Sequence, residues 1–190
     1  MNLVSPEVAA SLLEAGIGKR FHDMTLPDAG KEGVGLLEWL KYHGDGIRAG
    51  TTSVVFEGTG MIELITLLAR GLHINGVGCK IVPLVRMRQV IQSAEFRETI
   101  NECDCLVILN AQDRHRSNPL HDSVAAEVEY LIRQRYDNRR STFLHAAFVG
   151  AGTTDDRSYW SDEFWELVSK FETVKKDALA GDWYRKSLSA

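Results

Sequence analysis

Short apolar runs alternate with longer amphipathic segments along most of this chain, and this alternation constrains the fold more than any other feature. The runs expected of strands lie at 53–56, 80–84, 105–109 and 142–149. The segments with apolar side chains at helical spacing lie at 61–72, 86–100 and 124–136. Residues 105–109 are apolar without interruption, which is typical of a parallel strand covered on both faces. We therefore expect an α/β fold, a three-layer sandwich with a mostly parallel sheet.

The chain is expected to divide into three parts around this sheet. Residues 1–50 form a partly irregular N-terminal segment, with a short helix at 36–42 that the glycines on both sides interrupt. Residues 51–157 form the α/β core. Residues 158–190 form a helical C-terminal segment, whose aromatic side chains pack on the core or offer a surface to a partner.

The composition is that of an ordinary globular domain and excludes several classes of protein. The 190 residues carry a net charge of −4, and 44% of them are hydrophobic. This negative net charge argues against nucleic-acid binding that is driven by the charge of the whole molecule. No apolar run approaches the roughly 18–20 residues that span a bilayer, and residues 1–16 lack the basic start of a secretory signal. We expect a cytoplasmic protein without membrane contact, and without a metal site at its three cysteines.

The turn after the first predicted strand has the position of a phosphate-binding loop. Such a loop, G-x-x-x-x-G-K-[ST], cradles phosphates with backbone N–H groups, while its lysine reaches the outer phosphates and its hydroxyl holds Mg²⁺. Gly58, Thr59 and Gly60 keep part of this pattern. Met61 takes the place of the lysine and Ile62 that of the hydroxyl, and neither side chain can replace the lost charge or oxygen.

The strands predicted at 105–109 and 142–149 also lack the polar groups of a nucleotide hydrolase. In such enzymes the first of these strands ends in acidic residues that hold Mg²⁺ and polarise the attacking water. Here it ends in Leu109 and Asn110, and the end of the second strand lacks a polar sensor. His145 is interpreted as a histidine satisfied within the core. We therefore assign no catalytic residue.

Five short segments, in order, carry a resemblance to one family. Residues 16–21 (GIGKRF) resemble G-I-P-x-R-F/Y, 59–64 (TGMIEL) resemble T-G-K-T-x-L, and 69–72 (ARGL) resemble A-x-x-L. Residues 103–110 (CDCLVILN) are similar to x-D-x-L-x-I-D-D, and 132–142 (IRQRYDNRRST) to I-x-x-R-Y-x-x-R-x-P-T. These motifs belong to the DnaC/IstB-like branch of the AAA+ superfamily, the bacterial helicase loaders and insertion-sequence ATP-binding proteins. The resemblance implies a P-loop-NTPase-like (AAA+) sandwich.

The resemblance and the lost motifs together lead to a first hypothesis about function. A loader-like chain without the lysine, the hydroxyl and both acids is expected to be a pseudo-ATPase that requires neither ATP nor Mg²⁺. Such a protein, encoded by a phage or mobile element, would act in DNA replication by binding a replicative helicase, a loader or its own copies. The loop at 110–123 and the aromatic C-terminal segment are its candidate contact surfaces.

Two further hypotheses come from other classes. Single-stranded DNA could be bound by the arginine-rich segment 133–140 and the preceding predicted loop at 110–123, with one tyrosine stacking on a base. The residues concerned are Arg114, Arg116, Arg133, Arg135, Tyr136, Arg139 and Arg140. Alternatively, an atypical ATP-binding enzyme could recruit a lysine from elsewhere, such as Lys80 or Lys19.

Overall fold

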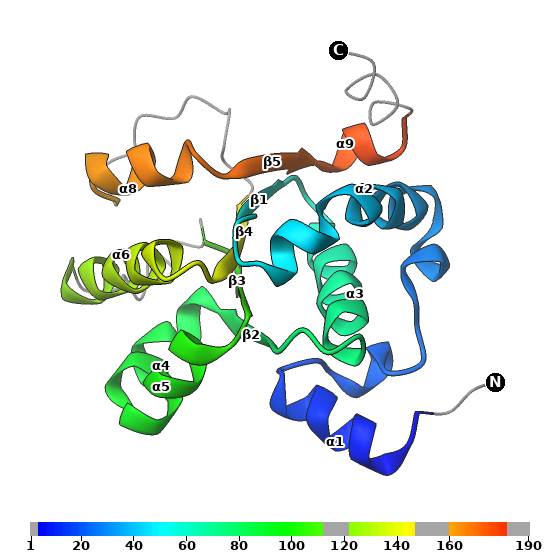
Figure 1. Cartoon of the computed structure of the whole chain (residues 1–190), viewed down its shortest axis with the longest axis horizontal. Coiled ribbons are helices and arrows are strands. Elements are labelled where there is room, and N and C mark those ends of the chain that lie inside the picture. The colour runs from blue at the N-terminus through cyan, green and yellow to red at the C-terminus, as the bar shows by residue number, and fades with distance from the viewer. Residues whose placement is uncertain (1–3, 112–121, 147–159, 182–190) are drawn as a thin grey trace.

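The computed structural model describes residues 4–111, 122–146 and 160–181, which form five strands flanked by helices (Figure 1). The strands are β1 (Val54–Glu57), β2 (Cys79–Pro83), β3 (Cys105–Leu109), β4 (Ser141–Ala146) and β5 (Glu172–Lys175). The α-helices are α1 (Pro6–Glu14), α2 (Gly30–Arg48), α3 (Met61–Ile74), α4 (Met87–Gln92), α5 (Ala94–Glu102), α6 (Asp122–Asp137), α8 (Asp162–Val168) and α9 (Lys176–Leu179). Short 3-10 helices occupy η1 (Lys19–Phe21), η2 (Leu26–Ala29) and η3 (Leu84–Arg86).

All five strands are parallel, in the order β2-β3-β4-β1-β5. The register aligns Val54 with Phe143 and Glu172, and Cys79 with Cys105. Strands β3 and β4 lie inside the sheet and are buried along their whole length. The predicted parallel α/β sandwich is confirmed, and the uninterrupted apolar run at 105–109 is indeed covered on both faces.

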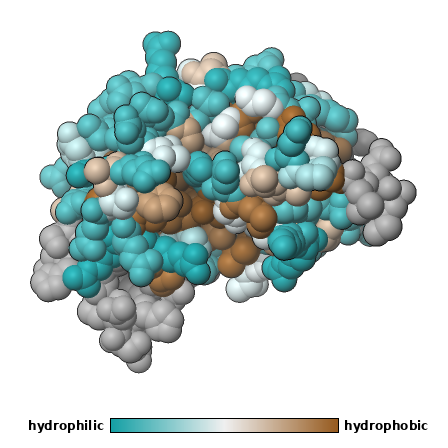
Figure 2. All heavy atoms as spheres, turned by 90° about the horizontal axis from the view of Figure 1, so that it is seen from below, coloured by the Kyte–Doolittle hydropathy of each residue, from teal (hydrophilic) through white to brown (hydrophobic). Residues whose placement is uncertain are grey.

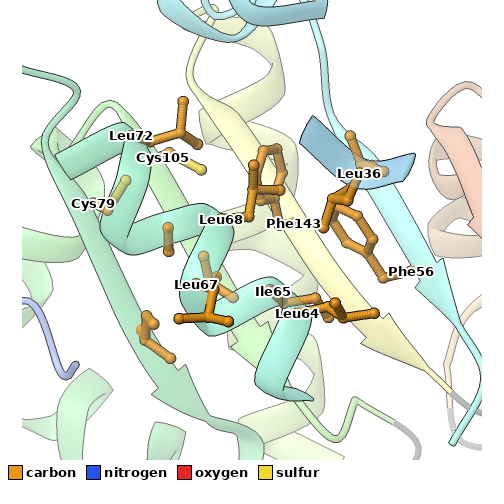
Figure 3. Packing of buried hydrophobic residues seen from close by; sticks show 14 of the residues in the cluster. Leu36, Phe56, Leu64, Ile65, Leu67, Leu68, Leu72, Cys79, Cys105 and Phe143 are labelled. Atoms are coloured by element: carbon orange, nitrogen blue, oxygen red, sulfur yellow. The ribbon is translucent and has the colours of Figure 1, made fainter. Parts of the chain in front are cut away.

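Helices cover both faces of the sheet and form two separate hydrophobic cores. Helices α1, α2 and α3 lie on one side in Figure 1, and α4, α5, α6 and α8 lie on the other. On the first face α3 lays Leu64, Leu67, Leu68 and Leu72 toward the strands, where Phe143 lies among them (Figure 3). The alternation of side chains along each strand sends neighbours to opposite cores, so that Val54 and Phe56 pack with α3 while Val55 packs with α6.

Helix α2 corrects the prediction that glycines confine the N-terminal helix to residues 36–42. The helix runs through Gly33, Gly35, Gly44 and Gly46. A Cβ at Gly33 would lie 1.8 Å from the carbonyl oxygen of Leu26, and one at Gly35 would lie 2.0 Å from that of Leu179. Gly33 and Gly35 are therefore sites of close packing, which outweighs their low helix propensity.

The C-terminal segment corrects the prediction of an all-helical 158–190. Its described residues, 160–181, contain strand β5 between α8 and α9. Strand β5 pairs with β1 and closes one edge of the sheet. Only Val174 of its four residues is buried, so the segment lacks the apolar run by which the other strands were predicted.

Candidate functional site: the loop between β1 and α3 and the arginine-rich end of α6

The loop between β1 and α3 contains only Gly58, Thr59 and Gly60. Gly58 has a φ of 116° and Gly60 a φ of 78°, a region that favours glycine, and this explains why two glycines stand in so short a turn. Residues 55–57, which would belong to a phosphate-binding loop, are instead paired with β4 and β5. Their backbone groups serve the sheet rather than a bound phosphate.

The two side chains predicted at the positions of the lysine and the hydroxyl belong to the hydrophobic core. Met61 is fully buried in the cluster beneath α3, and Ile62 is partly buried against the same cluster. Their side chains therefore contribute packing to the start of α3, and they offer no polar atom to the loop.

Two lysines that the sequence patterns did not single out lie beside this loop. A Cβ at Gly60 would lie 2.9 Å from the Nζ of Lys176, and one at Gly58 would lie 3.3 Å from the Cβ of Lys176. Lys175 Nζ lies 3.4 Å from Glu57 Oε2, and the Glu57 side chain is only 9% exposed. Both lysines come from the junction of β5 and α9, and they can reach the loop because β5 pairs beside β1.

A pocket of about 380 Å³ lies over the loop, and side chains of both charge signs line it. The residues that line it are Glu32, Glu57, Gly58, Thr59, Lys175, Lys176 and Asp177. Three carboxylates thus face two ammonium groups. A polyphosphate would meet net negative charge there, whereas in a working nucleotide site cations and backbone dipoles surround the phosphates.

His145 joins the loop to the ends of β3 and β4. Its Nδ1 accepts the N–H of Asn110 at 3.3 Å, so Nε2 carries the proton and faces the carbonyl oxygen of Gly58, also at 3.3 Å. Burial lowers the pKa of His145, while the bond to Gly58 opposes this shift. The interpretation of His145 as a satisfied core histidine is supported, because both of its ring nitrogens have partners and the residue is buried next to Ala146, the last residue of β4.

The end of β3 lies where the sequence placed it. Leu109 is buried, and Asn110 follows with a positive φ of 55°. The backbone of Ala111 donates to the carbonyl oxygen of His145 at 2.8 Å, which fixes this turn against β4. Asp104 lies at the other end of β3, directly before its first residue. There its carboxylate accepts hydrogen bonds from the backbone N–H of Gly78 and from the Arg140 guanidinium.

Arg135 is not a surface residue, and its prediction as a nucleic-acid or partner contact is wrong. Its side chain is buried between α6, the end of α5 and the start of β4. Nη1 donates to the carbonyl oxygens of Ile100 at 2.6 Å and Cys103 at 3.0 Å, and Nη2 to that of Ser141 at 2.7 Å. Burial lowers the pKa of Arg135, although the nearby thiols of Cys103 and Cys105 act in the other direction. The guanidinium caps the last carbonyls of α5, which favour a cation.

The other described arginines of this segment lie near the surface. Arg133 donates to the carbonyl oxygen of Glu163 at 3.3 Å, and Arg140 binds Asp104 at 2.7 Å. Tyr136 is 39% exposed and stacks on Phe171 with ring centroids 6.0 Å apart. These residues lie at the amino-terminal end of the strands, whereas the loop between β1 and α3 lies at the carboxyl-terminal end. The two groups are therefore separate.

Several predicted residues lie neither beside the loop between β1 and α3 nor among the described arginines at the end of α6. Arg114, Arg116 and most of the loop at 110–123 lie outside the described residues. Lys80 donates to the carbonyl oxygen of Glu14 at 2.9 Å, and neither Lys80 nor Lys19 lines the pocket over the loop. The lysine that approaches the loop is Lys176. No sequence signal could have found it without a prediction of β5.

Within 4–111, 122–146 and 160–181, no cluster of three or more His, Cys, Asp or Glu residues could hold a metal ion. In the same ranges no helix is both long and apolar enough to span a membrane.

The fold is shared with several solved replication proteins, to which this chain is similar in structure at low sequence identity. The chain matches AMPPCP-bound DnaA from Aquifex aeolicus with a TM-score of 0.61 and 13% identity, over 84% of this chain and 50% of that one. It matches DnaI with a TM-score of 0.55 and 13% identity, over 74% of this chain and 84% of that one. A proposed primosome component from Streptococcus pyogenes serotype M3 matches with a TM-score of 0.61 and 13% identity, over 88% of this chain and 94% of that one.

The chain spans about half the length of the replication initiators that it matches. No protein-family model matches the sequence, and no curated protein matches it either. At such identities the comparison shows the fold alone, an α/β sandwich with a parallel sheet, and carries no residue-level assignment.

Proposed function

We propose that this chain is an AAA+-like interaction protein of DNA replication that neither hydrolyses ATP nor binds it tightly. It acts by contacting a replicative helicase, a helicase loader or another copy of itself, in a phage or mobile-element context. The sequence resemblance to helicase loaders and the fold shared with DnaA and DnaI support the place in replication.

One observation supports the proposed loss of ATP chemistry: the loop between β1 and α3 is short, and the side chain of Lys176 lies against it. Strand β1 continues through Glu57, so only Gly58, Thr59 and Gly60 remain to form a cradle. Lys176 lies against Gly60, where bound phosphates would need room. Phosphoryl transfer depends on positioning and charge neutralisation, and the residues that would supply both are replaced.

Nucleotide binding is tested by the thermal unfolding of the full chain with Mg·ATP, Mg·ADP or neither. A ligand that binds only the folded state must raise the midpoint. We expect no rise and no release of inorganic phosphate. A rise of several degrees would contradict the proposal, and its loss in Lys176→Ala would then favour the atypical ATP-binding enzyme, with Lys176 in the role of the missing lysine.

Partner binding is tested separately with purified proteins. The full chain is immobilised and offered a replicative helicase, its loader, or both, and its own oligomeric state is measured by light scattering. We expect it to retain at least one of these proteins or to self-associate. Retention of none, together with a monomer in solution, would contradict the proposal.

Single-stranded DNA binding remains the second candidate, because Arg133 and Arg139 are exposed near the same end of α6. Burial of Arg135 and the ion pair between Arg140 and Asp104 weaken it. A titration with an oligothymidine at several salt concentrations decides, since phosphate contacts give a steep salt dependence. Binding lost in the double variant Arg133→Ala/Arg139→Ala would favour this function.

A further inference from the structure

A groove separate from the loop lies beside the edge strand β2, between the end of α1 and helices α4 and α5. Its volume is about 270 Å³. Its apolar lining residues include Ile81, Val82, Pro83, Val90, Phe96 and Ile100. Figure 2 views the side of the molecule where α1, α4 and α5 lie in Figure 1, and it shows apolar side chains gathered in the middle of that face. Phe96, which lines the groove, is 58% exposed.

The edge of β2 cannot accept an additional strand. The N–H of Cys79 donates to Nδ1 of His73 at 3.3 Å, and the N–H of Ile81 donates to the carbonyl oxygen of Ala15 at 2.8 Å. Pro83 has no N–H to offer. Gly16 also covers the edge, because a Cβ there would lie 2.6 Å from the carbonyl oxygen of Ile81. A partner must therefore enter with side chains, as an amphipathic helix does.

The rim of the groove carries an excess of positive charge. Lys80 and Arg86 line it together with one acidic residue, Glu14. Lys80 donates to the main-chain oxygen of Glu14 rather than to its carboxylate. In the described part of the chain, neither Lys80 nor Arg86 has a carboxylate within ion-pair distance. Two cations against one carboxylate, beside an apolar floor, complement a partner with apolar and acidic side chains.

We propose that this groove binds an amphipathic helix of a partner protein, with apolar side chains against Phe96 and Val90 and carboxylates facing Lys80 and Arg86. The apolar floor, in which Phe96 is the one aromatic side chain among the described residues, favours a protein over nucleic acid, because it has few groups that could hydrogen-bond to bases. This inference deepens the partner-binding part of the proposed function and rests on it. It does not depend on the loss of ATP binding.

The experiment selects peptides on the folded full chain from a phage-displayed random library. Peptides of about 16 residues suffice for roughly four helical turns. We expect the selected peptides to combine apolar residues at helical spacing with Asp or Glu. Their affinity, measured by fluorescence anisotropy, should fall about tenfold or more in Phe96→Ser and in Arg86→Glu.

Matched controls separate the groove from general effects. Tyr42→Ser removes another exposed aromatic side chain, from α2, and Arg88→Glu reverses another exposed charge, on α4, outside the groove lining. Both should leave peptide affinity unchanged, and all four variants should keep the circular dichroism of the parent. The inference is overturned if no such peptides are selected, if they bind Phe96→Ser as well as the parent, or if oligothymidine occupies the groove instead. If the groove fails this test but the chain still retains a helicase or a loader, only the groove inference is overturned, and the proposed function is not contradicted.

Discussion

At the scale of single residues, Arg135 shows how a charged side chain can serve the fold rather than a ligand. Its guanidinium donates to carbonyl groups at the end of α5 and at the start of β4. Removal would leave several buried acceptors unpaired, and each buried unpaired polar group is costly.

Arg135→Ala is therefore expected to lower the free energy of unfolding by about 3–5 kcal/mol, because buried carbonyl oxygens lose their donor and a cavity remains where the side chain was. Urea unfolding followed by circular dichroism measures it. The control is Arg133→Ala on the same helix, an exposed position at which a change of about 0.5 kcal/mol or less is expected. Similar losses in both variants would contradict the structural role of Arg135.

Two histidines predict how stability depends on pH. Burial lowers the pKa of both His73 and His145, with the charge of Lys80 adding to the effect at His73. Each Nδ1 accepts a backbone N–H, from Cys79 and from Asn110 respectively, and protonation would break that bond.

Because the folded pKa values lie below the unfolded value of about 6.5, both residues stay neutral in the folded protein and become charged more easily in the unfolded chain. Stability should be full above about pH 6.5 and decline as the pH falls through and below that value. Thermal unfolding between neutral and mildly acidic pH measures the slope. It should be shallower in the double variant His73→Gln/His145→Gln, and an unchanged slope would assign the dependence to other groups.

At the scale of elements, the contact of α9 with α2 holds the C-terminal segment over the loop. Gly35 of α2 lies so close to Leu179 of α9 that a Cβ would meet its carbonyl oxygen at 2.0 Å. Trp39 of the same helix donates from Nε1 to Glu172 of β5 at 2.9 Å. Helix α2 thus positions β5 and, through it, Lys176.

Gly35→Ala should destabilise the chain by about 1–3 kcal/mol, because an added methyl group overpacks this contact. Gly44→Ala lies on the same helix, where a Cβ would lie 3.8 Å from its nearest neighbour, a Leu40 side-chain carbon. It should stabilise by up to about 1 kcal/mol through helix propensity. Equilibrium unfolding of both variants tests this pair, and a common sign for the two would refute the close contact.

At the scale of the whole molecule, the sheet separates a protected centre from two edges. Strands β3 and β4 are buried throughout, whereas β5 has a single buried residue. Strand β2 lies at the other edge, where the chain around Ala15 and Gly16 covers it.

Amide hydrogen exchange should therefore be slowest in β3 and β4 and fastest, among the strands, in β5. Mass spectrometry of peptic fragments measures this order. Protection of β5 equal to that of β3 would mean that the C-terminal segment belongs to the most stable unit, and that Lys176 does not leave the loop short of global unfolding.

The alternating α/β architecture could be predicted from the sequence, because period-2 and period-3.6 patterns depend on local geometry and on which faces must be buried. The apolar character of Met61 and Ile62 could also be read from the sequence, since the chemistry of a side chain is the same in any fold. Only the tertiary structure revealed β5, the burial of Arg135 and the approach of Lys176 to Gly60. Each of these depends on neighbours distant along the chain: β5 is too polar to be recognised without β1 beside it, and an arginine among carbonyl groups looks in sequence like an arginine in water.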